Sequence, residues 1–271
     1  MQTQKTKIHL TQEQETLLIT LYAKCFGVPK SVFYDPKAYS ILNSVDYDFT
    51  QLKVTQGTKI TICLRAKRFD QLVQDFLNKH PDGTVMHLGA GLDSRFQRLD
   101  NERVHWVDLD LPDVIDLRKS FFEENDRCQM IAASAADLGW LDMVKINTTA
   151  VMILAEGLMM YLTEEEVRSL LLALQERFPG SLLAFDSYSP LTVRHINKHP
   201  SIRKTGARIQ WGIDDPHELE LWHPDVKFVE EWFFDQSEFI PQLDRLSRAL
   251  FCITRRIKAA RRAHRILVYE L

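Results

Sequence analysis

The sequence predicts an α/β fold in which a mostly parallel sheet of seven strands carries helices on both faces. The first observation is alternation, because short apolar segments and segments of helical spacing follow one another from Thr84 to Asp186. The second is the strongly apolar segment Thr149–Ala155, as expected for a strand buried on both faces. The third is a pair of later strand-like segments, Val226–Phe234 and Arg265–Leu271, which indicate that an antiparallel strand completes the sheet.

Each element has its own local signal. Capping-box spacings at Thr11 and at Thr163 each predict the start of a helix, and the second helix is expected to end at Phe178. The segment Ser187–Pro224 is rich in proline and glycine, so we expect an insert of short helices and loops there. The other predicted helices are Ile60–Asn78, Asp113–Glu124 and Pro241–Ala263, and the remaining strands are Thr84–Leu88, Val104–Leu109, Cys128–Ala133 and Ser181–Asp186.

The composition is that of an ordinary globular protein. Apolar residues make up 45% and charged residues 26%, which excludes an intrinsically disordered chain. The formal charge of -3 gives the chain as a whole no attraction to nucleic acid or to an anionic membrane. The four cysteines lie far apart and have no metal-site spacing, and the N-terminal segment has no signal-peptide pattern. We therefore expect no metal, no nucleic-acid or membrane partner, and a cytoplasmic location.

The strongest signal for a ligand site is the turn Gly89-Ala90-Gly91, which follows an apolar strand and precedes a helical segment. Glycines let a ligand approach the backbone, and a helix start offers free N–H groups. The dinucleotide pattern is incomplete, because Ser94 stands where a third glycine or alanine is expected. The next strand ends with Asp108 and Asp110, and only one of them can lie at its tip. We favour Asp110 for contact with a ribose, although both can instead cap the next helix.

Several segments together resemble the leucine carboxyl methyltransferase family, which includes polyketide-tailoring O-methyltransferases. They are YDPKAYSIL, LRAKRFD, LGAGLDSR, VDLDLPDVIDLRK and AEGLMMYL, within about Leu18–Tyr188. The resemblance implies a Rossmann-like class I methyltransferase fold and the cofactor S-adenosyl-L-methionine, with S-adenosyl-L-homocysteine as product. The sequence departs from the family in the alanines between Cys128 and Trp140, and in its last third.

The resemblance also implies cofactor-binding roles for individual residues. Arg65 matches an arginine that grips the methionine carboxylate, a planar anion that suits a guanidinium fork. The residues Gly89, Ala90 and Gly91 match the turn beneath the cofactor, and Asp110 matches the acid on the ribose. Asp137 and Leu138 match a pair beside the adenine, although Asp137 can equally be a helix cap.

The catalytic candidates follow the fourth predicted strand. Glu156 matches an acid near the methionine end of the cofactor, where it meets the ammonium or the sulfonium charge. A carboxylate in so apolar a segment is costly unless it is paired, which independently indicates a functional role. Tyr161 is expected to line the methyl-transfer site, with core packing as the alternative, and Lys24 lies near a basic position that some family members use.

The expected organisation is one methyltransferase domain. Residues 1–82 would form an N-terminal helical lid, 83–186 the cofactor-binding core, 187–225 an insert with the acceptor pocket, and 226–271 the closing strands and helix. The expected reaction is in-line methyl transfer to an oxygen of a small molecule, a carboxylate or a phenol. The alternatives are a Rossmann-type NAD(P)-dependent oxidoreductase and a non-catalytic S-adenosylmethionine-binding protein. We expect the basic last helix to be a solvated face, with contact to RNA or to an acidic face of a partner as the alternative.

Overall fold

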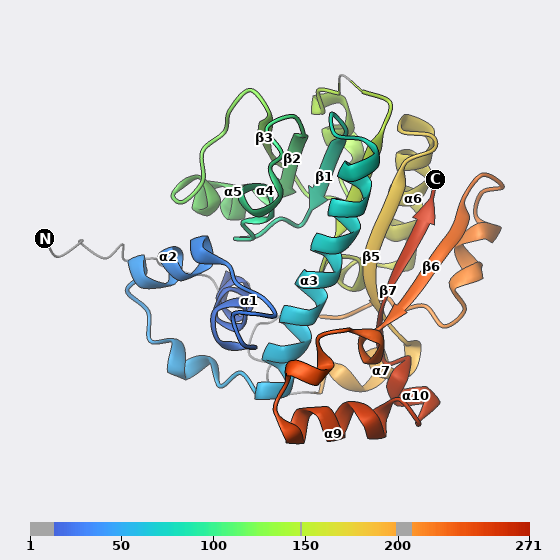
Figure 1. Cartoon of the computed structure of the whole chain (residues 1–271). Helices are drawn as coiled ribbons and strands as arrows, with labels where there is room; N and C mark the ends of the chain where they lie inside the picture. The colour runs from blue at the N-terminus through green and yellow to red at the C-terminus, as the bar shows by residue number, and fades with distance from the viewer. Residues whose placement is uncertain (1–13, 147, 199–207) are drawn as a thin grey trace, which may run out of the picture.

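A computed structural model describes residues 14–146, 148–198 and 208–271. In these residues seven strands form one sheet in the order β3-β2-β1-β4-β5-β7-β6 (Figure 1). Strands β1 to β5 run parallel, while β7 pairs antiparallel with both β5 and β6, so the predicted architecture is confirmed. The strands are β1 (Thr84–Leu88), β2 (His105–Asp110), β3 (Cys128–Ala132), β4 (Val151–Ala155), β5 (Leu182–Tyr188), β6 (Lys227–Phe233) and β7 (His264–Glu270).

Helices cover both faces of the sheet. In β4, Met152 and Leu154 pack in a cluster with α3, which crosses the front of the sheet in Figure 1. Ile153 and Ala155 point to the opposite face and pack in a cluster with α6. This alternation explains why the strand is apolar throughout. The α-helices are α1 (Gln14–Phe26), α2 (Pro36–Ser44), α3 (Gln56–Lys79), α4 (Arg95–Leu99), α5 (Pro112–Lys119), α6 (Glu164–Arg177), α7 (Pro190–Ile196), α9 (Arg245–Thr254) and α10 (Lys258–Arg261).

Short 3-10 helices fill several connections. They are η1 (Phe49–Leu52), η2 (Leu138–Met143), η3 (Met159–Tyr161), η4 (Pro216–Leu221), η5 (Phe234–Gln236) and η6 (Ile240–Gln242). Two of them, η2 and η3, follow β3 and β4 at the carboxyl ends of the parallel strands. The carboxyl edge is where open α/β sheets bind ligands.

The helix ends show which of the predicted helix boundaries are confirmed. The predicted capping box is present at the start of α6, where Thr163 and Glu166 bond to each other's backbone N–H. The predicted start at Thr11 lies outside the described residues. The single helix predicted over Pro241–Ala263 is wrong: the segment forms η6, α9 and α10, and Ile257 between the two α-helices is extended. β-Branched residues are frequent at this break, and they lower helix propensity.

Candidate functional site

Two adjoining cavities lie at the carboxyl edge of the sheet. The larger, of about 480 Å³, is bordered by the residues that follow β1, β2 and β4, and its volume is in the range of small-molecule sites. The smaller has about 150 Å³. Leu17 of α1, Gly89 and Tyr161 line both cavities, so α1 contributes to the cover of the edge.

The turn after β1 shapes the floor that the cavities share. Gly89 and Gly91 have positive φ angles of 71° and 51°, which glycine adopts without the strain of a Cβ atom. A Cβ on Gly91 would lie 2.9 Å from the Leu17 side chain. Ala90, between them, is buried and lines the smaller cavity. The turn therefore requires the small residues that the sequence places there.

Asp110, at the end of β2, borders the larger cavity. Its Oδ2 accepts a hydrogen bond from the Gly91 N–H at 2.7 Å, and its Oδ1 accepts one from the Leu111 N–H at 2.8 Å. A carboxylate offers about four acceptor positions, so about two remain for ligand hydroxyls. Burial raises the pKa of Asp110 above its ordinary value, and hydroxyl donors from a ligand would offset that effect.

Asp108 has a structural role instead. Its side chain is fully buried and accepts hydrogen bonds from Arg118 at 2.6 Å and from the Trp106 indole at 2.9 Å. Arg118 in turn donates to the carbonyl oxygens of Gly91 and Asp93, at 2.9 and 2.7 Å. The pair fixes the glycine turn from below, and of the two acids only Asp110 borders a cavity.

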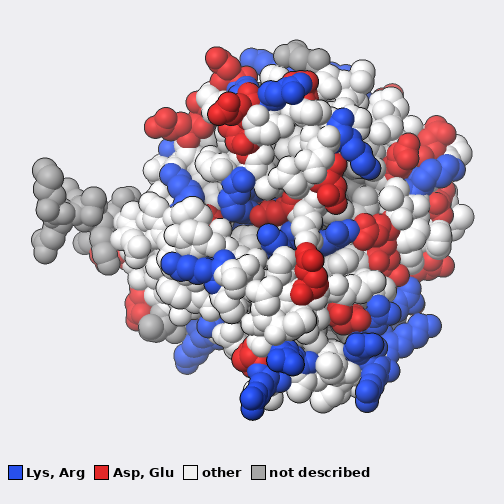
Figure 2. All heavy atoms as spheres, viewed as in Figure 1, with Lys and Arg blue, Asp and Glu red and all other residues white. Residues whose placement is uncertain are grey.

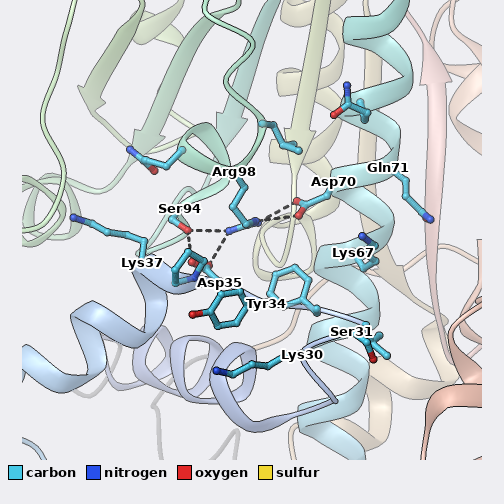
Figure 3. A pocket seen from close by; sticks show the side chains of 16 residues that line it. Lys30, Ser31, Tyr34, Asp35, Lys37, Lys67, Asp70, Gln71, Ser94 and Arg98 are labelled. Atoms are coloured by element: carbon cyan, nitrogen blue, oxygen red, sulfur yellow. Dashed lines mark hydrogen bonds and ion pairs between the residues drawn. The ribbon is translucent and has the colours of Figure 1, made fainter.

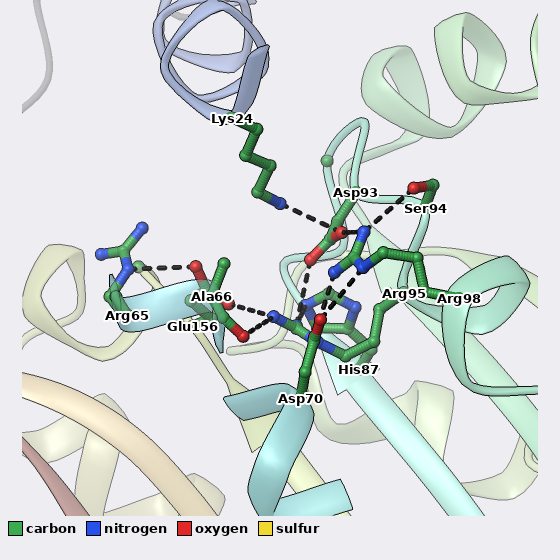
Figure 4. Close-up of polar contacts among 12 residues, drawn as sticks. Lys24, Arg65, Ala66, Asp70, His87, Asp93, Ser94, Arg95, Arg98 and Glu156 are labelled. Atoms are coloured by element: carbon green, nitrogen blue, oxygen red, sulfur yellow. Dashed lines mark hydrogen bonds and ion pairs between the residues drawn. The ribbon is translucent and has the colours of Figure 1, made fainter. Parts of the chain in front are cut away.

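A network of buried ion pairs surrounds the smaller cavity (Figure 4). Glu156 lies between two arginines: its Oε1 accepts from Arg65 Nε at 3.0 Å and its Oε2 from Arg95 Nη2 at 2.6 Å. Arg65 also donates from Nη1 to Asp186 Oδ2 at 2.7 Å, and His264 Nε2 lies 2.7 Å from the same oxygen. The expectation that Glu156 needs a partner is thus met by two arginines of this chain.

Asp186 and Arg65 hold each other in their charged forms. Burial by itself raises the pKa of Asp186, but the Arg65 guanidinium and His264 hold it well below its ordinary value. Arg65 Nη2 makes no hydrogen bond among the described residues. It faces Gly157, where φ is 70° and a Cβ would lie 3.2 Å from Nη2. One face of the guanidinium fork therefore stays open at a cavity that Arg65 lines.

Three further polar side chains line the smaller cavity. Lys24 of α1 is buried and pairs with Asp93 Oδ1 at 3.0 Å. Tyr161 and Tyr188 contribute phenol groups, and burial raises the pKa of both. Neither phenol oxygen makes a hydrogen bond within the described residues. The predicted site residue Tyr161 therefore lies at the cavity and not in the hydrophobic core.

The ion pairs continue away from the cavities. Arg95 donates to Asp70, and Asp70 also accepts from Arg98, which lines a separate cavity of about 520 Å³ (Figure 3). Arg98 bonds there to Asp35 and Ser94 as well. Because its buried charges already pair with one another, this larger hollow offers a ligand less than the carboxyl edge does.

The predicted adenine contacts lie elsewhere. Asp137 is exposed and caps η2 through the Gly139 N–H at 3.3 Å, and Leu138 packs against the core. Neither side chain lines the two cavities of the carboxyl edge, whereas Ser134 and its two alanine neighbours line the larger one. The helix-cap alternative for Asp137 therefore describes its position. From the insert, Arg208 and Gln210 line the larger cavity.

The sequence did not predict part of the ion-pair network. Arg95, Asp186 and His264 come from α4, β5 and β7, and no motif links them. Gly157 had a signal, since it directly follows the strand-end acid Glu156. In the described residues there is no group of three or more His, Cys, Asp or Glu side chains that could hold a metal ion. Nor does that part of the chain contain a helix suited to spanning a bilayer.

Comparisons with known proteins identify the family. The model of the family described as "Leucine carboxyl methyltransferase" matches residues 23–175. The tetracenomycin polyketide synthesis O-methyltransferase TcmP of Streptomyces glaucescens is 37% identical over 265 residues, which are 97% of this chain and 98% of TcmP. The S-adenosyl-L-methionine-dependent methyltransferase dpfgK of Gibberella zeae is 32% identical over 253 residues, covering 84% of this chain and 85% of dpfgK.

A solved structure supports the fold. The crystal structure of a DUF574 family protein from Streptomyces avermitilis superposes with a TM-score of 0.61 at 13% identity, covering 96% of this chain and 99% of that one. None of these matches supports the nicotinamide-dependent oxidoreductase. The chain belongs to the leucine carboxyl methyltransferase family and is an S-adenosylmethionine-dependent methyltransferase.

Proposed function

We propose that this enzyme binds S-adenosylmethionine across the two cavities and methylates an oxygen of a small molecule, with a carboxylate as the preferred acceptor. The observation that carries the proposal is the pair of adjoining cavities. Asp110, with free acceptor positions for ribose hydroxyls, borders one, and the open side of the Arg65 guanidinium faces the other. The name of dpfgK agrees with the cofactor, and the name of TcmP agrees with methyl transfer to an oxygen.

The residues fit the cofactor at both ends. The free acceptor positions of Asp110 suit two ribose hydroxyls, and the glycine turn allows close approach from below. The open Nη2 of Arg65 suits the methionine carboxylate, and Glu156 would stabilise the neighbouring positive charge. The adenine would lie near Ser134 and its alanine neighbours, with Asp137 and Leu138 at the start of the adjoining η2. When bound, the cofactor supplies an electrophilic methyl group on its sulfonium.

The donors of the smaller cavity favour an acceptor that is already anionic. Tyr161, Tyr188 and Lys24 can donate hydrogen bonds to a carboxylate, while Glu156 and Asp93 are engaged in ion pairs. His87 also lines this cavity, but burial and Arg95 hold its pKa well below the ordinary value, which makes it a weak base. A carboxylate needs no base near neutral pH, so the chain's contribution is to orient it and to exclude water.

Calorimetric titration tests the cofactor assignment. We expect micromolar binding of S-adenosylmethionine and S-adenosylhomocysteine, and none of NAD(H) or NADP(H). Arg65→Lys keeps the charge between Glu156 and Asp186 but loses the fork. It should weaken S-adenosylmethionine at least tenfold and leave adenosine unchanged. Equal losses for the two ligands would contradict the role given to Arg65.

A pH–rate profile tests the acceptor. With an aromatic carboxylic acid, the turnover rate should stay level from about pH 6 to 9, because the acid is ionised throughout. With a phenol of similar size, the rate should rise with pH as phenolate forms. Turnover of phenols alone would overturn the carboxylate preference, and cofactor binding without turnover of either class would favour the non-catalytic alternative.

A further inference from the structure

The segment from Arg245 to Ala263 contributes nothing to the two cavities, and its composition differs from that of the chain. It contains seven arginine and lysine residues and no Asp or Glu, whereas the formal charge of the whole chain is -3. Figure 1 places α9 and α10 at the lower edge of the molecule, and Figure 2 shows Lys and Arg side chains gathered there. The segment ends next to the antiparallel pair Tyr188 and His264, so it lies at the carboxyl edge of the sheet.

An apolar row on α9 is exposed. Leu246, Leu250 and Ile253 have the spacing i, i+4, i+7 of one helix face, with exposed fractions of 81%, 55% and 58%. Ile257 continues the exposed apolar surface at 52%. α9 has no buried residue, and Phe251 packs only partly against the core. A helix of ten residues is marginal without packing, so a cover on this face would stabilise it.

Most of the cations on this segment are unpaired. Arg261 pairs with Asp235 at 2.9 Å, and Arg262 lies 3.9 Å from Glu231. The other five make no ion pair within the described part of the chain; they are Arg245, Arg248, Arg255, Arg256 and Lys258. Helical geometry places Arg245 about a quarter turn from the apolar row and Arg248 on the opposite side of α9, while Arg256 follows α9 next to the exposed Ile257. The accessible surface of α9 and α10 therefore carries both an apolar row and unpaired cations.

The charge pattern distinguishes between the possible binding partners of this surface. A second copy joined through this face by a twofold axis would bring five unpaired cations against five. A nucleic acid would satisfy the cations and leave the aliphatic row in water. A protein groove that takes the apolar row would need acidic side chains placed to match these cations. An anionic bilayer is a planar surface that takes the cations at its headgroups and the aliphatic row at the acyl boundary.

We propose that α9 and α10 dock the enzyme reversibly on anionic lipid surfaces through these five unpaired cations and this apolar row. The whole-chain charge predicted no attraction to a membrane, and the segment itself was expected to be a solvated face. The local charge is opposite in sign to the net charge, and a membrane responds to the charge within about 10 Å of its surface. The docking is peripheral and depends on salt.

Vesicle binding tests the proposal. The full chain is cosedimented with phosphatidylcholine vesicles and with 7:3 phosphatidylcholine–phosphatidylglycerol vesicles. We expect binding to the second kind only, with loss at high salt. Each cation near an anionic surface contributes roughly a fivefold gain in partitioning, so Arg245→Gln with Arg256→Gln should weaken binding more than tenfold. Leu246→Ser with Leu250→Ser should weaken it as well, and both pairs are exposed, which leaves the fold intact.

The chain offers a matched control and a built-in probe. Leu221 is 85% exposed and Lys227 is exposed near the opposite edge of the sheet, so Leu221→Ser with Lys227→Gln should leave vesicle binding unchanged. Cys252 on α9 is the exposed thiol, while Cys25, Cys63 and Cys128 are buried with their pKa raised to about 12 by burial. An environment-sensitive fluorophore on Cys252 should shift to the blue with anionic vesicles.

Three results would overturn the proposal. They are equal binding to both vesicle kinds, equal effects of the α9 and control variants, and absence of binding at low salt. If the chain instead binds soluble poly-L-glutamate and no vesicles, the face recognises an acidic protein and the lipid assignment is wrong. Circular dichroism of each variant verifies that α9 changes have not unfolded the chain.

Discussion

The two cavities of the carboxyl edge are built in different ways. At the larger, Asp110 is held by backbone N–H groups that lie no more than 19 residues away along the chain. The smaller is surrounded by buried charges from distant segments, such as the Arg65–Asp186 pair, separated by 121 residues. The support of Asp110 follows from local sequence, while that of Arg65 and Asp186 depends on the whole fold. The difference predicts that substitutions at the smaller cavity destabilise the protein, while those at the larger one mainly affect binding.

The largest expected effect is that of Asp186→Asn. It leaves Arg65 and His264 without their shared carboxylate in a fully buried position, and breaking a buried pair costs about 3–5 kcal/mol. Urea unfolding should show that loss, and activity should fall with it. Asp137→Asn is the matched control, because that side chain is exposed and makes one weak cap contact. Equal losses of unfolding free energy in the two variants would contradict the stabilising role of the ion-pair network.

Asp110→Asn should affect binding more than stability. The amide removes charge-assisted acceptors from the ribose end, a loss of about 1.5–3 kcal/mol or at least tenfold in affinity. S-adenosylhomocysteine and adenosine should lose affinity by the same factor, since both carry the ribose, and titration calorimetry measures both. Unchanged affinity would remove Asp110 from the site. A large fall in the free energy of unfolding would contradict the expected difference between Asp110 and Asp186.

Gly157→Ala separates backbone strain from crowding of Arg65. Its φ is 70°, and the new Cβ would lie 3.2 Å from Arg65 Nη2. Gly180 is a matched control, because its φ is 77° and nothing lies within 4 Å of its Cβ position. Both alanine variants should lose about 1–2 kcal/mol of stability from the left-handed conformation. Only Gly157→Ala should also raise the KM for S-adenosylmethionine, by several-fold in a steady-state assay.

The smallest effect concerns pH. Burial and Arg95 hold the pKa of His87 well below 6.5 in the folded state, so the unfolded chain takes up a proton that the folded chain does not. Below about pH 6.5 this group therefore lowers the free energy of unfolding as pH falls, by up to about 1.4 kcal/mol per unit. His87→Gln should flatten the profile between pH 6.5 and 5. An unchanged slope would show that His87 is protonated in the fold.

The sequence by itself determined how strands and helices follow one another along the chain, because apolar runs, caps and glycine turns are local signals. It also placed the glycine turn and Asp110 at one edge, since parallel strands end together. Only the tertiary structure decided the environment of Glu156, which two arginines hold, and the exposed position of Asp137. The reason is physical: ion pairs between distant segments form only after the sheet brings those segments together, and no local pattern records the pairing.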